Sequence, residues 1–90
     1  MRRTIFVTTK YKKDLKRLAK RGNNLDKLDS IVEFLVHDIS LPPQNLDHLL
    51  TGNWKNHMEC HIEPDWLLIY KKVEKDLILT RTGTHTDLFL

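Results

Sequence analysis

The chain has 90 residues, 40% of them hydrophobic, and a formal net charge of +3. This length allows one domain over residues 1–90 with one modest core, and it is too short for two domains. No apolar run approaches the roughly 20 residues of a membrane span, the start is too short for a signal peptide, and Cys60 is the only cysteine, so we expect a cytoplasmic protein without membrane partners or disulfides.

The first part of the chain predicts a strand followed by a helix. Residues 4–8 are all β-branched or aromatic, which favours a strand. Thr9 is positioned to cap the helix that follows, and Gly22 is positioned to stop it. The apolar stripe of this helix is formed by Tyr11, Leu15, Leu18 and Ala19.

A second helix is predicted directly after the first. Asn24 is positioned to cap it, and residues 41–43 (Leu-Pro-Pro) end it because proline has no amide donor and disfavours helix before it. Its apolar stripe consists of Leu25, Leu28, Val32, Leu35 and Ile39. Both helices therefore offer one face to a common core.

The charge is divided unevenly along the chain. Residues 1–27 contain ten Lys and Arg against two Asp, a balance of +8, whereas residues 28–90 contain five against ten Asp and Glu, a balance of −5. The cationic face of the first helix is suited to docking a polyanion such as RNA or an acidic protein partner. A solvated helix face is the structural alternative.

The C-terminal half changes to a period of two, typical of strands. From Trp54 onward, His57, Glu59 and His61 point one way while the residues between them point the other. Residues 63–65 form a turn, residues 66–73 a strand that is apolar on both faces at its start and therefore central, and residues 77–82 a strand that closes the sheet.

Two polar motifs flank this predicted hairpin, residues 59–66 before its first strand and residues 81–85 after its second. Antiparallel pairing brings both motifs to the same end of the sheet. We therefore expect one substrate to be within reach of four side chains, those of His61, Asp65, Arg81 and His85.

Three spaced motifs resemble a known family: Asp47-His48-x-Leu50-x-Gly52-x-Trp54-Lys55, His61-x-Glu63-Pro64-Asp65-Trp66-x-Leu68-Ile69-Tyr70 and Arg81-Thr82-Gly83-Thr84-His85-x-x-Leu88-Phe89. In this order they look like the YafQ branch of the RelE-type toxins, within the RelE/ParE superfamily. The resemblance covers nearly the whole chain. It implies a type II toxin that cuts messenger RNA in the ribosomal A site, and a small α+β fold with an N-terminal strand and two helices packed on a mostly antiparallel twisted sheet of about four strands.

The resemblance also implies functional positions, which are His48, His61, Asp65, Trp66, His85 and Phe89. RNA cleavage without a metal or other cofactor needs a base for the 2′-OH, an acid for the leaving 5′-oxygen and cations near the phosphate. We expect His85 or His61 to protonate the leaving group, Asp65 to act as base or orienter, and His48 to position the substrate. Arg81 and Lys55 are expected to meet phosphate, and Trp66 and Phe89 to stack on bases.

Each of these residues also has a structural interpretation, and two other functions remain open. Trp66 is equally suited to the core, and Phe89 to clamping the terminus. A zinc site would draw on His57, Cys60 and His61, but strand alternation turns Cys60 away from the two imidazoles. The other function is a non-catalytic RNA- or protein-binding basic module, in which the histidines are incidental.

The partners implied by the resemblance are messenger RNA, the ribosome with its rRNA, and a cognate antitoxin. DNA would be reached only through the antitoxin. Because a cationic helix face complements an acidic tail, we expect the antitoxin to cover the first helix. The residues of this predicted contact are Lys12, Lys13, Lys16, Arg17, Lys20 and Arg21.

Overall fold

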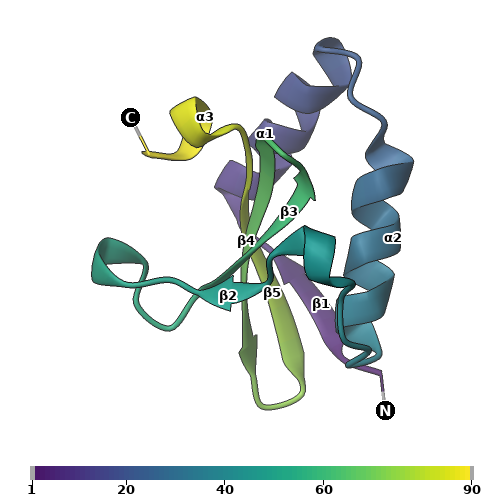
Figure 1. Cartoon of the computed structure of the whole chain (residues 1–90), viewed down its shortest axis with the longest axis vertical. Coiled ribbons are helices and arrows are strands. Elements are labelled where there is room, and N and C mark those ends of the chain that lie inside the picture. Colours follow the sequence, from purple (N-terminus) through teal and green to yellow (C-terminus); the bar gives the residue numbers. More distant parts are fainter. Residues whose placement is uncertain (1, 90) are drawn as a thin grey trace.

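One five-stranded sheet, in the order β1-β5-β4-β3-β2, organises the computed structural model, which describes residues 2–89. The strands are β1 (Thr4–Val7), β2 (His48–Leu49), β3 (Met58–Glu63), β4 (Trp66–Val73) and β5 (Asp76–Gly83). The helices are α1 (Thr9–Lys20), α2 (Leu25–Val36) and α3 (His85–Phe89), and the 3-10 turns are η1 (Pro43–Asn45) and η2 (Gly52–Trp54). In Figure 1, α1 and α2 lie along one side of the sheet and α3 lies near its upper end.

The predicted order of strand, two helices and three-stranded meander is confirmed, with two differences at the sheet edges. β1 pairs in parallel with β5, so β5 is an inner strand and does not close the sheet. β2 forms the opposite edge by pairing with the start of β3, which raises the strand count from about four to five. A two-residue strand carries too little periodicity to be visible in the sequence.

The helix boundaries depend on local capping. Thr8, and not Thr9, is the N-cap of α1, because its side-chain oxygen accepts the amide hydrogen of Tyr11. Asn24 caps α2 as predicted. α2 ends at Val36, before the prolines, because Asp38 adopts a left-handed conformation (φ 56) that turns the chain out of the helix. Ile39 consequently lies outside the helix and is 53% exposed.

The core lies mainly between the sheet and the two long helices. Strand β4 is buried on both faces, so its central position in the sheet is confirmed. Trp66, Leu68 and Tyr70 pack toward the helices, and a smaller cluster on the other face contains Leu67 and Ile69. This second cluster is covered by Leu88 of α3 and by Trp54 of η2. The packing on this face of β4 therefore holds α3 and η2 against the sheet.

None of the helices within residues 2–89 combines the length and the hydrophobicity that crossing a membrane requires.

Candidate active site

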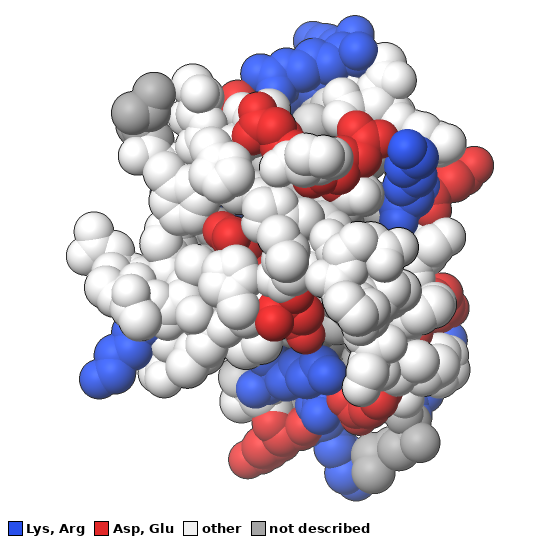
Figure 2. Space-filling view, viewed as in Figure 1, with Lys and Arg blue, Asp and Glu red and all other residues white. Residues whose placement is uncertain are grey.

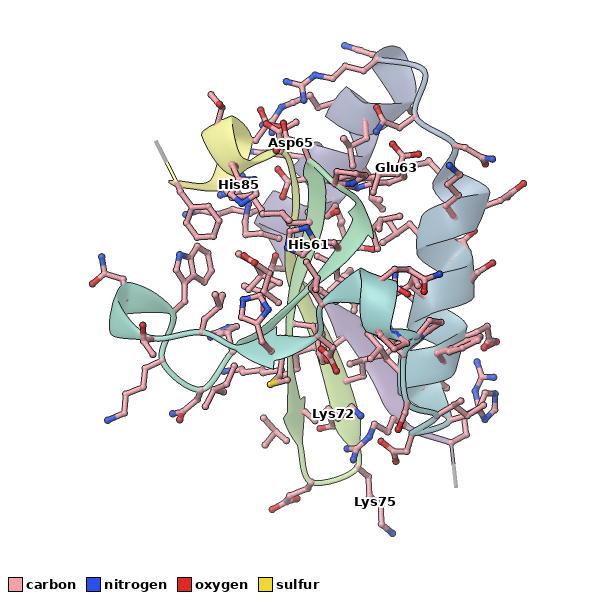
Figure 3. All side chains as sticks on the ribbon, viewed as in Figure 1. His61, Glu63, Asp65, Lys72, Lys75 and His85 are labelled. Carbon is pink, nitrogen blue, oxygen red and sulfur yellow. The ribbon has the colours of Figure 1, made fainter. Side chains whose placement is uncertain are left out.

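His85 and Asp65 form the best-defined polar pair at the end of the β4–β5 hairpin. One carboxylate oxygen of Asp65, in the turn between β3 and β4, accepts hydrogen bonds from the backbone N–H of His85 at 3.0 Å and from its Nδ1 at 2.9 Å. The backbone N–H of His85, followed by its imidazole, holds the pKa of Asp65 below its usual range. Figure 3 shows both residues at the upper end of the sheet, so the predicted meeting of the two motifs is confirmed.

Two further imidazoles share a buried carboxylate beside this pair. Nε2 of His48 on β2 lies 3.3 Å from Oε1 of Glu59 on β3, and Nε2 of His61 lies 3.7 Å from the same oxygen. Glu59 is 5% exposed. The Nδ1 atoms point away from it, to the carbonyl oxygens of Leu46 at 2.6 Å and Pro64 at 3.2 Å. Because a carbonyl oxygen only accepts, each Nδ1 donates and Nε2 is the nitrogen left for proton exchange.

The three imidazoles and one aromatic ring form a row across the surface. Ring centroids are 6.4 Å apart between His48 and His61, 6.0 Å between His61 and His85, and 6.1 Å between His85 and Phe89. Phe89 is 42% exposed and stands edge-on to Trp54 at 6.2 Å. The row therefore places acid–base groups next to a partly open aromatic face.

The structure corrects the prediction for Trp66. Its side chain is 2% exposed and lies in the helix-facing core, where Nε1 donates to the hydroxyl oxygen of Thr82 at 3.0 Å. Alternation along β4 sends Trp66 to the same face as Leu68 and Tyr70, away from the imidazoles. The structural interpretation of Trp66 is therefore the one that holds, and it stacks on no base in this arrangement.

Arg81 also has an intramolecular partner. Its Nε and Nη2 donate to the two carboxylate oxygens of Asp14 on α1, at 2.7 and 2.9 Å. Asp14 is 1% exposed and accepts the backbone N–H of Thr82 as well, at 3.1 Å. The Arg81 guanidinium thus compensates the charge of the buried Asp14 carboxylate. The prediction that Arg81 contacts phosphate did not include this internal partner. Lys55, after η2, is exposed.

Cys60 lies in the helix-facing core, on the other side of β3 from His61. Burial of its thiol raises the pKa to about 12. The zinc alternative needs a thiolate on the imidazole face, which this orientation does not supply. Within residues 2–89 no group of three or more His, Cys, Asp or Glu is arranged to hold a metal ion.

A family model for the YafQ bacterial toxin of type II toxin–antitoxin systems matches residues 3–90. The chain belongs to the YafQ family. The mRNA interferase toxin YafQ of Escherichia coli strain K12 is 41% identical over 90 residues, covering 99% of this chain and 98% of that protein. The E. coli DinJ–YafQ toxin–antitoxin complex contains a chain with TM-score 0.92 and 41% identity over the full length of both. A metal-bound toxin from Helicobacter pylori has TM-score 0.91 and 42% identity, covering 99% of this chain and 100% of the other.

Glu59 is the residue of this cluster to which the sequence analysis assigned no role. The period of two already put it on the face of His61, and that signal was sufficient to include it. Its burial between two imidazoles depends on β2, which the sequence does not reveal. His57 packs edge-on against Trp54, at 5.7 Å between ring centroids, and its Nδ1 lies 3.2 Å from the carbonyl oxygen of Lys55.

Proposed function

We propose that this chain is an mRNA interferase: a toxin that inhibits translation by cutting messenger RNA at the ribosomal A site, without a metal ion, and that a cognate antitoxin neutralises. The name of the E. coli relative supports the reaction class. The observation that carries the proposal is the imidazole of His85, held by Asp65 and standing 6.0 Å from that of His61. Two oriented imidazoles at this spacing suit acid–base chemistry on one phosphodiester.

His85 serves as the general acid in this proposal. Its Nδ1 donates to Asp65, which leaves Nε2 to protonate the departing 5′-oxygen as the 2′-oxygen forms its new bond to phosphorus. Asp65 serves as the orienter, because a carboxylate whose pKa is lowered is a weak base and a good hydrogen-bond acceptor. The proposal therefore takes Asp65 as the orienter and not as the base.

His61 serves as the general base and takes the proton from the 2′-OH through Nε2. Glu59 lies 3.7 Å from this nitrogen and stabilises the imidazolium that forms. His48, 3.3 Å from the same carboxylate oxygen, positions the substrate at the end of the row.

Phe89 and Lys55 complete the RNA contact in this proposal. The exposed ring of Phe89 provides a flat face next to His85 for an unstacked base. The ammonium of Lys55 is exposed after η2 and meets the phosphate backbone.

The decisive experiment is cleavage of a defined messenger RNA by the wild type and by His85→Ala, with and without programmed ribosomes and with EDTA in parallel. We expect cutting that survives EDTA, requires His85 and is enhanced by ribosomes. His37→Ala is the matched control, because His37 is an exposed histidine paired with Glu33, and it should cut like the wild type. No cutting by the wild type, with RNA binding intact, would replace this proposal with the binding-module alternative.

We also propose that the antitoxin docks on the cationic face of α1 through an acidic segment of its own chain. Figure 2 shows Lys and Arg at the top of the molecule, with Asp and Glu side chains directly below them. Within residues 2–89, four of the six predicted contacts form no ion pair with the chain itself, whereas Arg17 and Arg21 are already paired with its own carboxylates. The four residues are Lys12, Lys13, Lys16 and Lys20.

Charge reversal tests this docking face. Lys16→Glu and Lys20→Glu should weaken the complex with the cognate antitoxin in a titration, because like charges then meet across the interface. Lys75→Glu, in the turn between β4 and β5 at the opposite end of the molecule (Figure 3), is the control with the same charge change. Equal affinity of all three variants would place the antitoxin elsewhere.

A further inference from the structure

Helix α3 carries two members of the proposed site yet has little packing of its own. It has five residues, with His85 at its start and Phe89 at its end. Leu88 is its only buried side chain. A helix of this length is not stable by itself, so its orientation must come from contacts with other elements. The position of the His85 imidazole depends on those contacts.

Asp87 is where these contacts converge. Its Oδ2 accepts the backbone N–H of Thr84 at 3.0 Å, and the hydroxyl of Thr84 accepts the backbone N–H of Asp87 at 3.1 Å, a reciprocal cap of the first turn. The same carboxylate accepts two hydrogen bonds from Arg21 at the C-terminus of α1, at 2.7 and 3.0 Å. A planar two-point contact of this kind fixes direction as well as distance.

Gly83 shows how closely the Asp87 side chain lies against the chain before α3. A Cβ atom at Gly83 would lie 2.8 Å from Oδ2 of Asp87 and 3.0 Å from its Cβ. The backbone there has φ 156, which also disfavours a side chain. The glycine therefore allows the carboxylate to fold back over the strand end while facing Arg21.

We propose that the Arg21–Asp87 ion pair is a positioning lock that sets the orientation of α3, and through it the place of His85 in the acid–base row. The inference rests on the proposed function, since the consequence of the lock is a rate of RNA cleavage. Arg21 and Asp87 are positioning residues and touch no reacting atom. Arg17, with Nη1 3.9 Å from Asp87 and 3.2 Å from Asp14, links the lock to the carboxylate that also holds Arg81.

Arg21→Gln is the test variant, because the Arg21 side chain is 44% exposed and its loss removes none of the groups that cap α3. We expect kcat for RNA cleavage to fall about 10-fold with KM within about twofold, since misplacing a catalytic group acts on the reaction and not on substrate capture. Arg21→Lys keeps the charge and one hydrogen bond, and should restore most of the rate. Lys10→Gln is the control, with the same loss of charge on an exposed α1 residue that forms no ion pair within residues 2–89.

Amide hydrogen exchange provides a readout that does not depend on catalysis. The amide hydrogens of Asp87 and Leu88 in α3 are hydrogen-bonded to Thr84, the residue before the helix. They should exchange faster in Arg21→Gln while those of α1 remain protected. Unchanged α3 exchange together with the kcat of Lys10→Gln would overturn the lock. Absence of RNA cleavage by the wild type would instead count against the proposed function, and the exchange comparison would still decide the lock.

Discussion

Each imidazole of the row is held through the same ring nitrogen. Nδ1 donates to a carbonyl oxygen in His48 and His61 and to a carboxylate in His85. Two segments of the chain, one at Leu46 and one at Pro64 and Asp65, thus impose one tautomer on the neutral rings and leave Nε2 for proton transfer. The orientation of the proton-transfer atoms is therefore set by local hydrogen bonds, and substitution of the side-chain acceptor, Asp65, should affect catalysis more than folding.

Asp65→Asn tests this at the residue scale. The amide oxygen still accepts from His85 but carries no charge to stabilise the imidazolium, so we expect kcat to fall by about 100-fold with little change in KM. Steady-state cleavage of a defined RNA measures both constants. Glu63→Gln serves as the control. It removes a carboxylate that lies two residues before Asp65 in the chain and is paired with Lys27. Equal rates for the two variants would remove Asp65 from the mechanism.

At the scale of elements, the long periodic segments and the β-branched strand β1 were predictable, whereas β2 and α3 were not. α1 and α2 repeat an apolar stripe over 12 residues each, and β4 is apolar on both faces at its start, so pattern alone located them. β2 and α3 are too short to carry a period, and the end of α2 depends on the left-handed Asp38, which proline spacing does not indicate. The motifs before β4 and at the end of β5 were brought together correctly because the hairpin register follows from the two strands.

Gly83→Ala tests the placement of α3. The added methyl group would meet the Asp87 carboxylate at 2.8 Å, and the displaced carboxylate would lose Arg21, Thr84 or both. We expect kcat to be lower than that of the wild type by at least about 10-fold, with secondary structure retained in circular dichroism. Gly22→Ala, where the added atom has open space, controls for a substituted positive-φ glycine. A fully active Gly83→Ala would show that α3 tolerates the shift.

At the scale of the whole molecule, a buried carboxylate ties the N-terminal helix to the C-terminal strand. β1 pairs with β5 only as far as Leu79, and beyond that point Asp14 of α1 takes over the edge by accepting the N–H of Thr82. Arg81 and Arg17 compensate its charge. Asp14, an acidic residue in a mostly cationic helix, thus connects α1 to β5 through Arg81 and the backbone N–H of Thr82.

Asp14→Ala is expected to lower the free energy of unfolding by about 3 kcal/mol, because it leaves the half-buried Arg81 and one strand N–H without their acceptor. Urea denaturation followed by circular dichroism measures this change. Asp29→Ala, an exposed acid on α2, is the control and should lie within about 0.5 kcal/mol of the wild type. A loss of similar size in both variants would contradict the assignment.

Acid should weaken the molecule through Asp87. Hydrogen bonds from Arg21, followed by those from Thr84, hold the pKa of this carboxyl below its usual range. A depressed folded-state pKa stabilises the fold fully above the unfolded-state value of about 3.9, and this contribution is lost as the pH falls below it. The free energy of unfolding should therefore decline more steeply below pH 4 in the wild type than in Asp87→Asn, as measured by urea denaturation across a pH series. Parallel curves would exclude Asp87 from the acid response.

Because Cys60 is buried, the reactivity of its thiol reports on unfolding of the protein. The thiol is fully enclosed between β3 and the helices, and its raised pKa of about 12 keeps it protonated near neutrality. An alkylating reagent therefore reacts only when the core opens, and the labelling rate at a single sulfur counts global opening events. Because the imidazole row lies on the other face of the sheet, the same label can be followed while RNA is bound there.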